Sequence, residues 1–128
     1  MAASRLRVAV VEDEVSVRKA ISRLLRVSGF EVETFASGIA FLESLSSRRP
    51  DCVVLDLYLP GLNGFEVQGR LAEMKMRVPI VVITGQDEPG ASGRAIAAGA
   101  AAYLLKPLEG FSLLEALRLA IAENRPAL

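Results

Sequence analysis

The sequence has no histidine and only one cysteine among its 128 residues. Without an imidazole, zinc sites built on histidine and catalytic triads that need a histidine base are excluded. Cys52 has no cysteine partner for an internal disulfide, and because it opens an apolar run we expect a small buried side chain. This use of cysteine favours a reducing compartment, and we expect the cytoplasm.

An excess of charge of either sign is also missing, because 15 Lys and Arg residues balance 15 Asp and Glu residues. A neutral chain has no general electrostatic attraction to nucleic acid or to an anionic membrane, so we expect this domain to bind neither directly. The run VAVV is too short for a signal-peptide core, and residues 95–105 are too few and too interrupted by glycine to span a bilayer. Length and composition indicate one ordinary globular domain.

Five apolar or alternating runs predict β-strands, at residues 7–11, 31–35, 52–57, 79–84 and 101–106. Segments with helical periodicity separate them. The first helix is expected to end at Gly29, and the others begin near residues 37, 63, 88 and 111. Regular alternation of strands and helices predicts an α/β fold, a parallel sheet with helices on both faces.

The polarity of the strands predicts their order in the sheet. Residues 31–35 alternate between polar and apolar side chains, whereas 7–11, 52–57 and 79–84 are almost continuously apolar. Strands covered on both faces have the continuous pattern, so 31–35 should lie at an edge. This predicts a flavodoxin-like, doubly wound (βα)5 sandwich with strand order 2-1-3-4-5. Ligands bind such sheets beyond the carboxyl ends of the strands, where the winding reverses.

Polar residues stand at these carboxyl ends: Glu12 and Asp13 follow the first strand, and Asp56, Thr84 and Lys106 lie at the ends of the third, fourth and fifth. Each alone has an ordinary structural explanation, such as a helix cap or a solvated strand end. Together, however, carboxylates about 4 Å apart would repel by roughly 4 kcal/mol per pair at an effective dielectric constant near 20. We therefore expect a bound cation, and oxygen ligands without histidine or cysteine favour Mg²⁺ or Mn²⁺.

Four segments, VVEDE, VVLDLYLPGLNGFEV, VPIVVITGQDE and AAGAAAYLLKPL, carry a resemblance to a known family. They resemble the receiver domain of two-component response regulators, over essentially the whole chain. The specific part of the match is the spacing of 43, 28 and 22 residues that joins Asp13, Asp56, Thr84 and Lys106. The segments LPGLNG and ITGQ most resemble receivers whose regulators carry a helix-turn-helix output domain.

The resemblance implies a phosphorylatable signalling switch. Asp56 would accept a phosphoryl group from a histidine kinase or a histidine phosphotransfer protein, and the domain would catalyse its own phosphorylation and dephosphorylation. Glu12, Asp13 and Asp56, with the backbone carbonyl of Tyr58, would hold Mg²⁺. Lys106 would pair with the Asp56 carboxylate and then with the phosphoryl oxygens.

The resemblance also implies how the signal leaves the site. The Thr84 hydroxyl would bind a phosphoryl oxygen, and Tyr103 would turn inward as Thr84 moves. The face made by the fourth helix, the fifth strand and the fifth helix would then change, and regulate an output domain or a homodimer. The Lys106–Pro107 bond is expected to be cis. Because segment 90–102 is rich in glycine and poor in large side chains, we expect the fourth helix to be the most mobile.

Three other functions compete with this interpretation. A flavodoxin-like electron carrier would need hydroxyls and glycines after the first strand, where this chain is acidic. A haloacid-dehalogenase-type phosphatase would need a carboxylate two residues after the nucleophile, where Tyr58 stands. The alternative left open is a non-phosphorylated docking or dimerisation module, although Asp56, Thr84 and Lys106 are all present.

The chain divides into a predicted receiver domain, residues 1–122, and a C-terminal tail or start of a linker, residues 123–128, where the sequence turns polar and meets Pro126. A kinase is expected to dock over the first helix and the loop near Pro107 and Leu108. Periodicity alone leaves open whether Val17 belongs to that surface or to the core.

Overall fold

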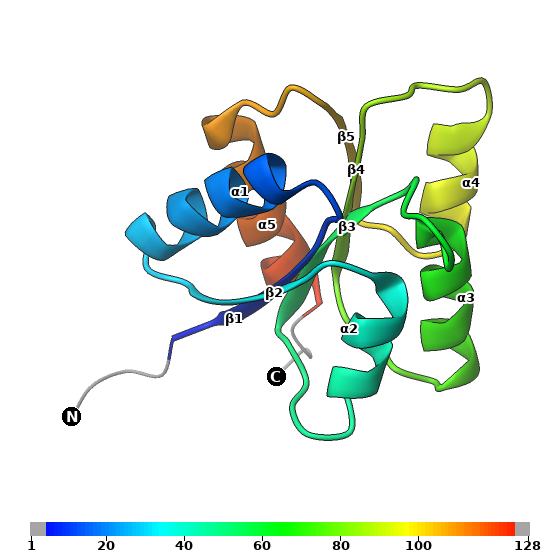
Figure 1. Cartoon of the computed structure of the whole chain (residues 1–128), viewed down its shortest axis with the longest axis horizontal. Helices are drawn as coiled ribbons and strands as arrows, with labels where there is room; N and C mark the ends of the chain where they lie inside the picture. The colour runs from blue at the N-terminus through cyan, green and yellow to red at the C-terminus, as the bar shows by residue number, and fades with distance from the viewer. Residues whose placement is uncertain (1–4, 125–128) are drawn as a thin grey trace.

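Five parallel strands form the centre of the computed structural model, which describes residues 5–124 (Figure 1). The strands are β1 (Arg7–Val11), β2 (Glu31–Phe35), β3 (Cys52–Asp56), β4 (Ile80–Thr84) and β5 (Ala102–Leu105). Their order is β2-β1-β3-β4-β5, which confirms the flavodoxin-like prediction and the edge position of residues 31–35. The predicted strand ends agree with the observed ends to within one residue.

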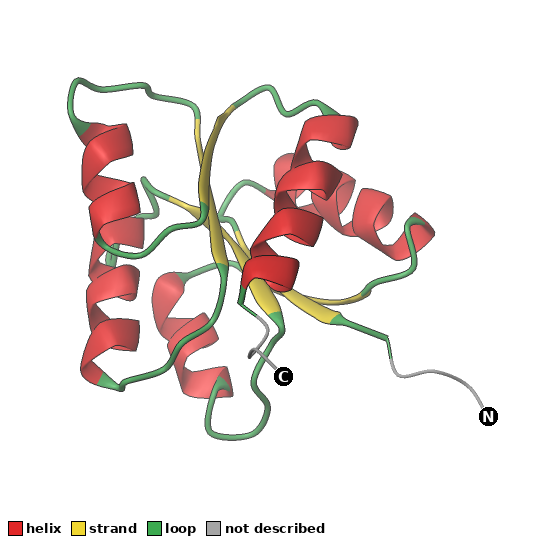
Figure 2. Ribbon diagram, turned by 180° about the vertical axis from the view of Figure 1, so that it is seen from behind, coloured by secondary structure: helices red, strands yellow, loops and turns green. Residues whose placement is uncertain are grey.

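Helices cover both faces of the sheet. They are α1 (Val15–Val27), α2 (Gly38–Ser44), α3 (Gly64–Glu73), α4 (Ala91–Ala97) and α5 (Gly110–Glu123). α1 and α5 lie on one face and α2, α3 and α4 on the other (Figure 2). The first residue of the predicted tail, Glu123, is still helical, and residues 125–128 lie outside the described residues. No helix within residues 5–124 has the length and apolarity needed to cross a membrane.

Burial explains why three strands are continuously apolar. β3 and β4 are buried at every position, and β1 at every position after Arg7. On one face they pack against residues such as Leu25 and Leu117, and on the other against Phe41 and Val67. Cys52 is fully buried, as expected, and burial raises the pKa of its thiol to about 12.

Two helices end on a left-handed glycine. Gly29 has a φ of 97°, and the N–H of Phe30 donates to the Leu25 carbonyl at 3.0 Å, which is the Schellman arrangement. Gly99, with a φ of 107°, ends α4 in the same way. α3 uses the same bonds with Lys75 at the left-handed position, φ 55°. These ends define where each helix turns back toward the sheet.

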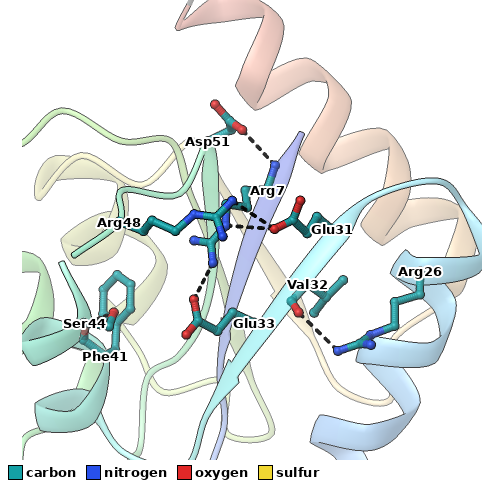
Figure 3. Close-up of polar contacts among 9 residues, drawn as sticks. All are labelled: Arg7, Arg26, Glu31, Val32, Glu33, Phe41, Ser44, Arg48 and Asp51. Carbon is teal, nitrogen blue, oxygen red and sulfur yellow. Dashed lines mark hydrogen bonds and ion pairs between the residues drawn. The ribbon is translucent and has the colours of Figure 1, made fainter. Parts of the chain in front are cut away.

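Charged side chains cover the edge strand β2 (Figure 3). Arg7 of β1 pairs with Glu31 at 3.3 Å and with Glu33 at 2.6 Å. The guanidinium of Arg26 in α1 donates to the carbonyl of Val32 at 3.1 Å, which gives that backbone group of β2 a partner. The acidic side chains and this bond hold β2 beside β1 and next to α1.

Candidate functional site

The carboxyl ends of β1 and β3 bring three carboxylates together. One oxygen from each of Glu12, Asp13 and Asp56 lies within 4.8 Å of the others. The two strands are neighbours, with Val11 opposite Leu55, so the residues that follow them meet at one edge of the sheet. Glu12 and Asp56 are buried and Asp13 is exposed. An acidic cluster of this kind could hold a metal ion.

Lys106 is the cation at this site. Its Nζ lies 2.7 Å from Glu12 Oε1 and 3.6 Å from Asp56 Oδ2. The sequence predicted Asp56 as its partner, and the shorter ion pair is with Glu12. Lys106 directly follows β5, and its bond to Pro107 is cis, as predicted. One ammonium against three carboxylates leaves the site with excess negative charge.

The pKa values of Glu12, Asp56 and Lys106 are all raised. Burial raises the pKa of the Glu12 carboxyl, and Lys106 and the Glu14 N–H oppose this only in part. Burial likewise raises the pKa of Asp56 against the opposing effect of Lys106. Burial would lower the pKa of Lys106, but the Glu12 and Asp56 carboxylates outweigh it and raise that pKa. The ionised carboxylates are therefore held at a free-energy cost that a divalent cation would reduce.

The turn that carries the acidic pair is held from α1. The guanidinium of Arg18 donates to the backbone carbonyls of Glu12 at 2.8 Å and of Asp13 at 3.2 Å. Glu12 Oε2 accepts the N–H of Glu14 at 3.1 Å. Glu12 Oε1 is buried, and its partner among the described residues is the Lys106 ammonium at 2.7 Å. That oxygen could serve as a metal ligand. Arg18 was not predicted from the sequence, where its only signal is its place one turn into the helix after the acidic pair.

The first residue of α3 packs against the backbone of Asp56. A Cβ on Gly64, the first residue of α3, would lie 2.6 Å from the Asp56 carbonyl oxygen and 2.7 Å from Leu57 Cα, so only glycine fits. A capping box between Asn63 and Glu66 sets this start: each side chain accepts the other's backbone N–H, at 2.9 and 3.0 Å. In the sequence Asn63 and Gly64 indicate only the start of a helix, so this contact was not predicted.

A depression of about 420 Å³ opens above the carboxylates. Its lining residues are Glu12, Asp13, Glu14, Asp56, Tyr58, Gly85, Gln86 and Lys106. The Tyr58 N–H donates to Asp56 Oδ1 at 3.4 Å, so the turn after β3 is tied to the acidic side chain. Of the residues predicted from the sequence, Glu12, Asp13, Asp56, Tyr58 and Lys106 are brought together here.

The other two predicted residues contact the loop that follows β4. Thr84 is fully buried, and its hydroxyl donates to the Gln86 carbonyl and accepts the Gln86 N–H, both at 3.1 Å. The Tyr103 hydroxyl donates to Asp87 Oδ1, also at 3.1 Å. Thr84 and Tyr103 are thus joined through residues 86 and 87, beside the depression.

Comparison with known proteins gives the family. A model of the response regulator receiver domain matches residues 8–118. Nodulation protein W of Bradyrhizobium diazoefficiens is 37% identical over 97% of this chain and 55% of its own length. Response regulator protein TmoT of Ectopseudomonas mendocina is 36% identical over 88% of this chain and 51% of its own length. The chain thus spans about half the length of these curated relatives.

Solved structures agree. The crystal structure of FixJ-N is 32% identical, with a TM-score of 0.87 over 98% of this chain and all of that one (100%). The structure of response regulator StyR is 41% identical, with a TM-score of 0.84 over 94% of this chain and 61% of that chain. With this fold, and with an acidic cluster at the switch point of the sheet, the chain belongs to the response regulator receiver domains of two-component systems.

Proposed function

We propose that this domain is a phosphorylatable switch in which Asp56 accepts a phosphoryl group from a phosphohistidine. The donor would be a histidine kinase or a histidine phosphotransfer protein. The proposal rests on the surroundings of the buried Asp56 carboxylate. It is clustered with Glu12 and Asp13, Lys106 Nζ lies 3.6 Å from it, and an open depression lies above it.

The transfer needs little covalent chemistry from the protein. An Asp56 carboxylate oxygen forms a bond to phosphorus, and the phosphorus–nitrogen bond to the donor imidazole breaks with its electron pair going to that nitrogen. Positioning and charge neutralisation provide most of the catalysis in such reactions. Lys106 lies where it can neutralise negative charge that arrives at Asp56.

Magnesium, or manganese, is the cation that suits this site. The ligands would be carboxylate oxygens of Glu12, Asp13 and Asp56 and the backbone carbonyl of Tyr58, an all-oxygen set of the kind that hard divalent cations prefer. The three carboxylates within 4.8 Å of one another, with only the Lys106 ammonium against them, support the fit. When bound, the ion would supply positive charge beside the incoming phosphoryl oxygens.

The switch would use the loop after β4. A phosphoryl oxygen would compete with the backbone of Gln86 for the Thr84 hydroxyl, and Tyr103 is tied to the next residue of the same loop, Asp87. This loop leads directly into α4, so the α4-β5-α5 face would change and act on an output domain or a second copy. The curated relatives are nearly twice as long as the matched span, which leaves room in them for such a domain. Transcription is the output we propose, from the likeness of LPGLNG and ITGQ to regulators of that class.

The kinase would dock beside α1. A depression of about 310 Å³ lies between α1 and the loop after β5, and Val17, Leu24, Pro107 and Leu108 are part of its lining. Val17 is half-buried and packs against the core, so it belongs to both the core and the rim of this depression. A donor placed here would lie next to Lys106, which also borders the depression. Such signalling would take place in the cytoplasm.

The test is incubation with acetyl phosphate and Mg²⁺, followed by intact-mass measurement. We expect one added phosphoryl group in the wild type, none in Asp56→Asn, and none after EDTA. An unmodified wild type, or an undiminished gain in Asp56→Asn, would overturn the proposal. If the domain is instead a non-phosphorylated docking or dimerisation module, its dimerisation constant should not change when the phosphodonor is added.

A further inference from the structure

Helix α4 has little apolar anchoring of its own. Of its seven residues only Ala91 and Ala95 are buried, and Ile96 is 46% exposed. Gly90 precedes it with a φ of 83° and provides no side-chain cap. A short, uncapped helix that buries only two methyl groups depends on other contacts for its position.

Those contacts come from α3, which lies beside α4 on the same face of the sheet (Figure 1). The Gln68 side chain, which is 2% exposed, donates its Nε2–H to the Ala95 carbonyl at 3.0 Å. The guanidinium carbon of Arg94 lies 3.9 Å from the centre of the Phe65 ring, a cation–π contact. One buried hydrogen bond and one cation–π contact therefore join the two helices.

Packing alone does not account for Gln68. Its Oε1 is buried and has no hydrogen-bond partner in the part of the chain that the structure describes. The Ala95 carbonyl already accepts the N–H of Ala100 at 3.0 Å, so it does not need Gln68 for its satisfaction. An apolar side chain of the same size would fill this position without leaving a buried acceptor unpaired.

The N-terminal end of α3 packs against the backbone of Asp56. Gly64 packs so closely on the Asp56 carbonyl that no Cβ fits, and its N–H donates to the Leu57 carbonyl at 2.8 Å. A continuous path of contacts therefore runs from the backbone of Asp56 through α3 to Gln68 and α4. An open depression of about 610 Å³ lies beside the end of this path, and its lining includes Gln68 together with Ala98 and Gly99, the two residues that follow α4.

We propose that Gln68 is a positioning residue that couples α4 to α3, so that a change at Asp56 reaches α4 by a route separate from Thr84 and Tyr103. The signal that this route carries rests on the proposed phosphorylation of Asp56. In the structure α4 is bound to Gln68, and the signal would shift the junction toward a state in which this bond is broken.

The first test measures amide hydrogen exchange of residues 91–98 in the unphosphorylated protein. Gln68→Met keeps the volume of the side chain and removes its hydrogen bond. Because one such bond contributes modestly to stability, we expect roughly three- to tenfold faster exchange in α4, with α5 unchanged. The matched control is Glu73→Met, at an exposed position of the same helix, which should leave α4 unaffected. Equal α4 exchange in wild type and Gln68→Met would overturn the proposal.

A second variant separates the hydrogen bond from packing. In Gln68→Glu a protonated carboxyl can donate to the Ala95 carbonyl and an ionised one cannot. After correction for intrinsic exchange rates, α4 protection should rise as the pH falls in Gln68→Glu and stay flat in Gln68→Met. The same pH profile in both variants would contradict a role for the donated bond.

The final arm adds acetyl phosphate and Mg²⁺, with phosphoryl occupancy read by intact mass. At equal occupancy we expect a smaller phosphorylation-induced change in α4 exchange for Gln68→Met than for wild type. An equal change would overturn the coupling route. If the wild type gains no phosphoryl group, the proposed switch is wrong and this route carries no phosphorylation signal. Hydrogen exchange in the unphosphorylated protein still decides whether Gln68 holds α4.

Discussion

Replacing Asp56 with asparagine should stabilise the metal-free protein. The substitution removes one charge from the cluster and keeps an oxygen that can accept the Tyr58 N–H, which donates to Asp56 at 3.4 Å. Lys106 keeps its shorter ion pair with Glu12 at 2.7 Å. The change in stability therefore reports on the electrostatic cost of the Asp56 charge, with little change in packing.

The structure gives the size of the effect. Asp56 and Glu12 oxygens within 4.8 Å repel by about 3.5 kcal/mol at an effective dielectric constant near 20. Lys106 at 3.6 Å attracts the Asp56 charge by about 4.6 kcal/mol, and the exposed Asp13 repels it by about 1 kcal/mol in a water-like dielectric. These terms nearly cancel, so the burial of the carboxylate decides the sign, in agreement with its raised pKa. We expect a gain of about 1 kcal/mol in the free energy of unfolding, or roughly 3–5 °C in Tm.

The assay is urea unfolding followed by circular dichroism, because urea does not screen charges as guanidinium chloride does. In EDTA the Asp56→Asn protein should unfold at higher urea than wild type. With Mg²⁺ at ten times its Kd the wild type should gain about 1.4 kcal/mol and the variant less. Glu43→Gln, which removes an exposed carboxylate on α2, is the control and should change neither result. An Asp56→Asn protein that is less stable than wild type in EDTA would refute the reasoning.

Three further predictions follow. The pKa of the Asp56 carboxyl is higher in the folded protein than in the unfolded chain. Its charge therefore lowers the free energy of unfolding by the full amount at a pH above the folded-state pKa, and this destabilisation disappears as the pH falls through that pKa. The advantage of Asp56→Asn in EDTA should therefore shrink as urea midpoints are measured at lower pH; an advantage that grows would contradict this. Cys52, buried with a thiol pKa of about 12, should react with a disulfide reagent at pH 8 only in urea-unfolded protein, and rapid labelling of native protein would show the burial to be wrong. Gly64→Ala should lower the free energy of unfolding by about 1–3 kcal/mol through overpacking, whereas Gly69→Ala, with no atom within 4 Å, should raise it by about 0.5–1 kcal/mol; equal effects would refute the close fit at Gly64.

Strand polarity predicted which strand lies at the edge of the sheet, and the flavodoxin-like order with that strand at its edge is the observed one. The alternation of residues 31–35 arises because β2 is an edge strand with exposed Glu31, and the continuous runs arise because β3 and β4 are covered on both faces. The predicted parallel sheet also indicated which strand ends meet, because parallel strands in this order bring Glu12 and Asp56 together at one edge.

Contacts that depend on side-chain rotamers or on helix packing could not be predicted in this way. Lys106 can reach either buried carboxylate from the end of β5, and a difference of about one ångström decides that Glu12 is closer. Gly64 looks in the sequence like an ordinary residue after a helix cap, and only its approach to the Asp56 backbone shows why no side chain fits. Gln68 has the spacing of a core position, so its bond to Ala95 depends on where α4 packs.

The cover of charge on β2 limits how this domain can associate with itself. A further strand would need free backbone groups along β2, but Arg26 occupies the Val32 carbonyl and the exposed Glu31 places a charge beside any strand added there. Extension of the sheet from one molecule to the next is therefore disfavoured at this edge. Concentrated solutions should favour assemblies that join through helical surfaces, and these can dissociate without breaking a sheet.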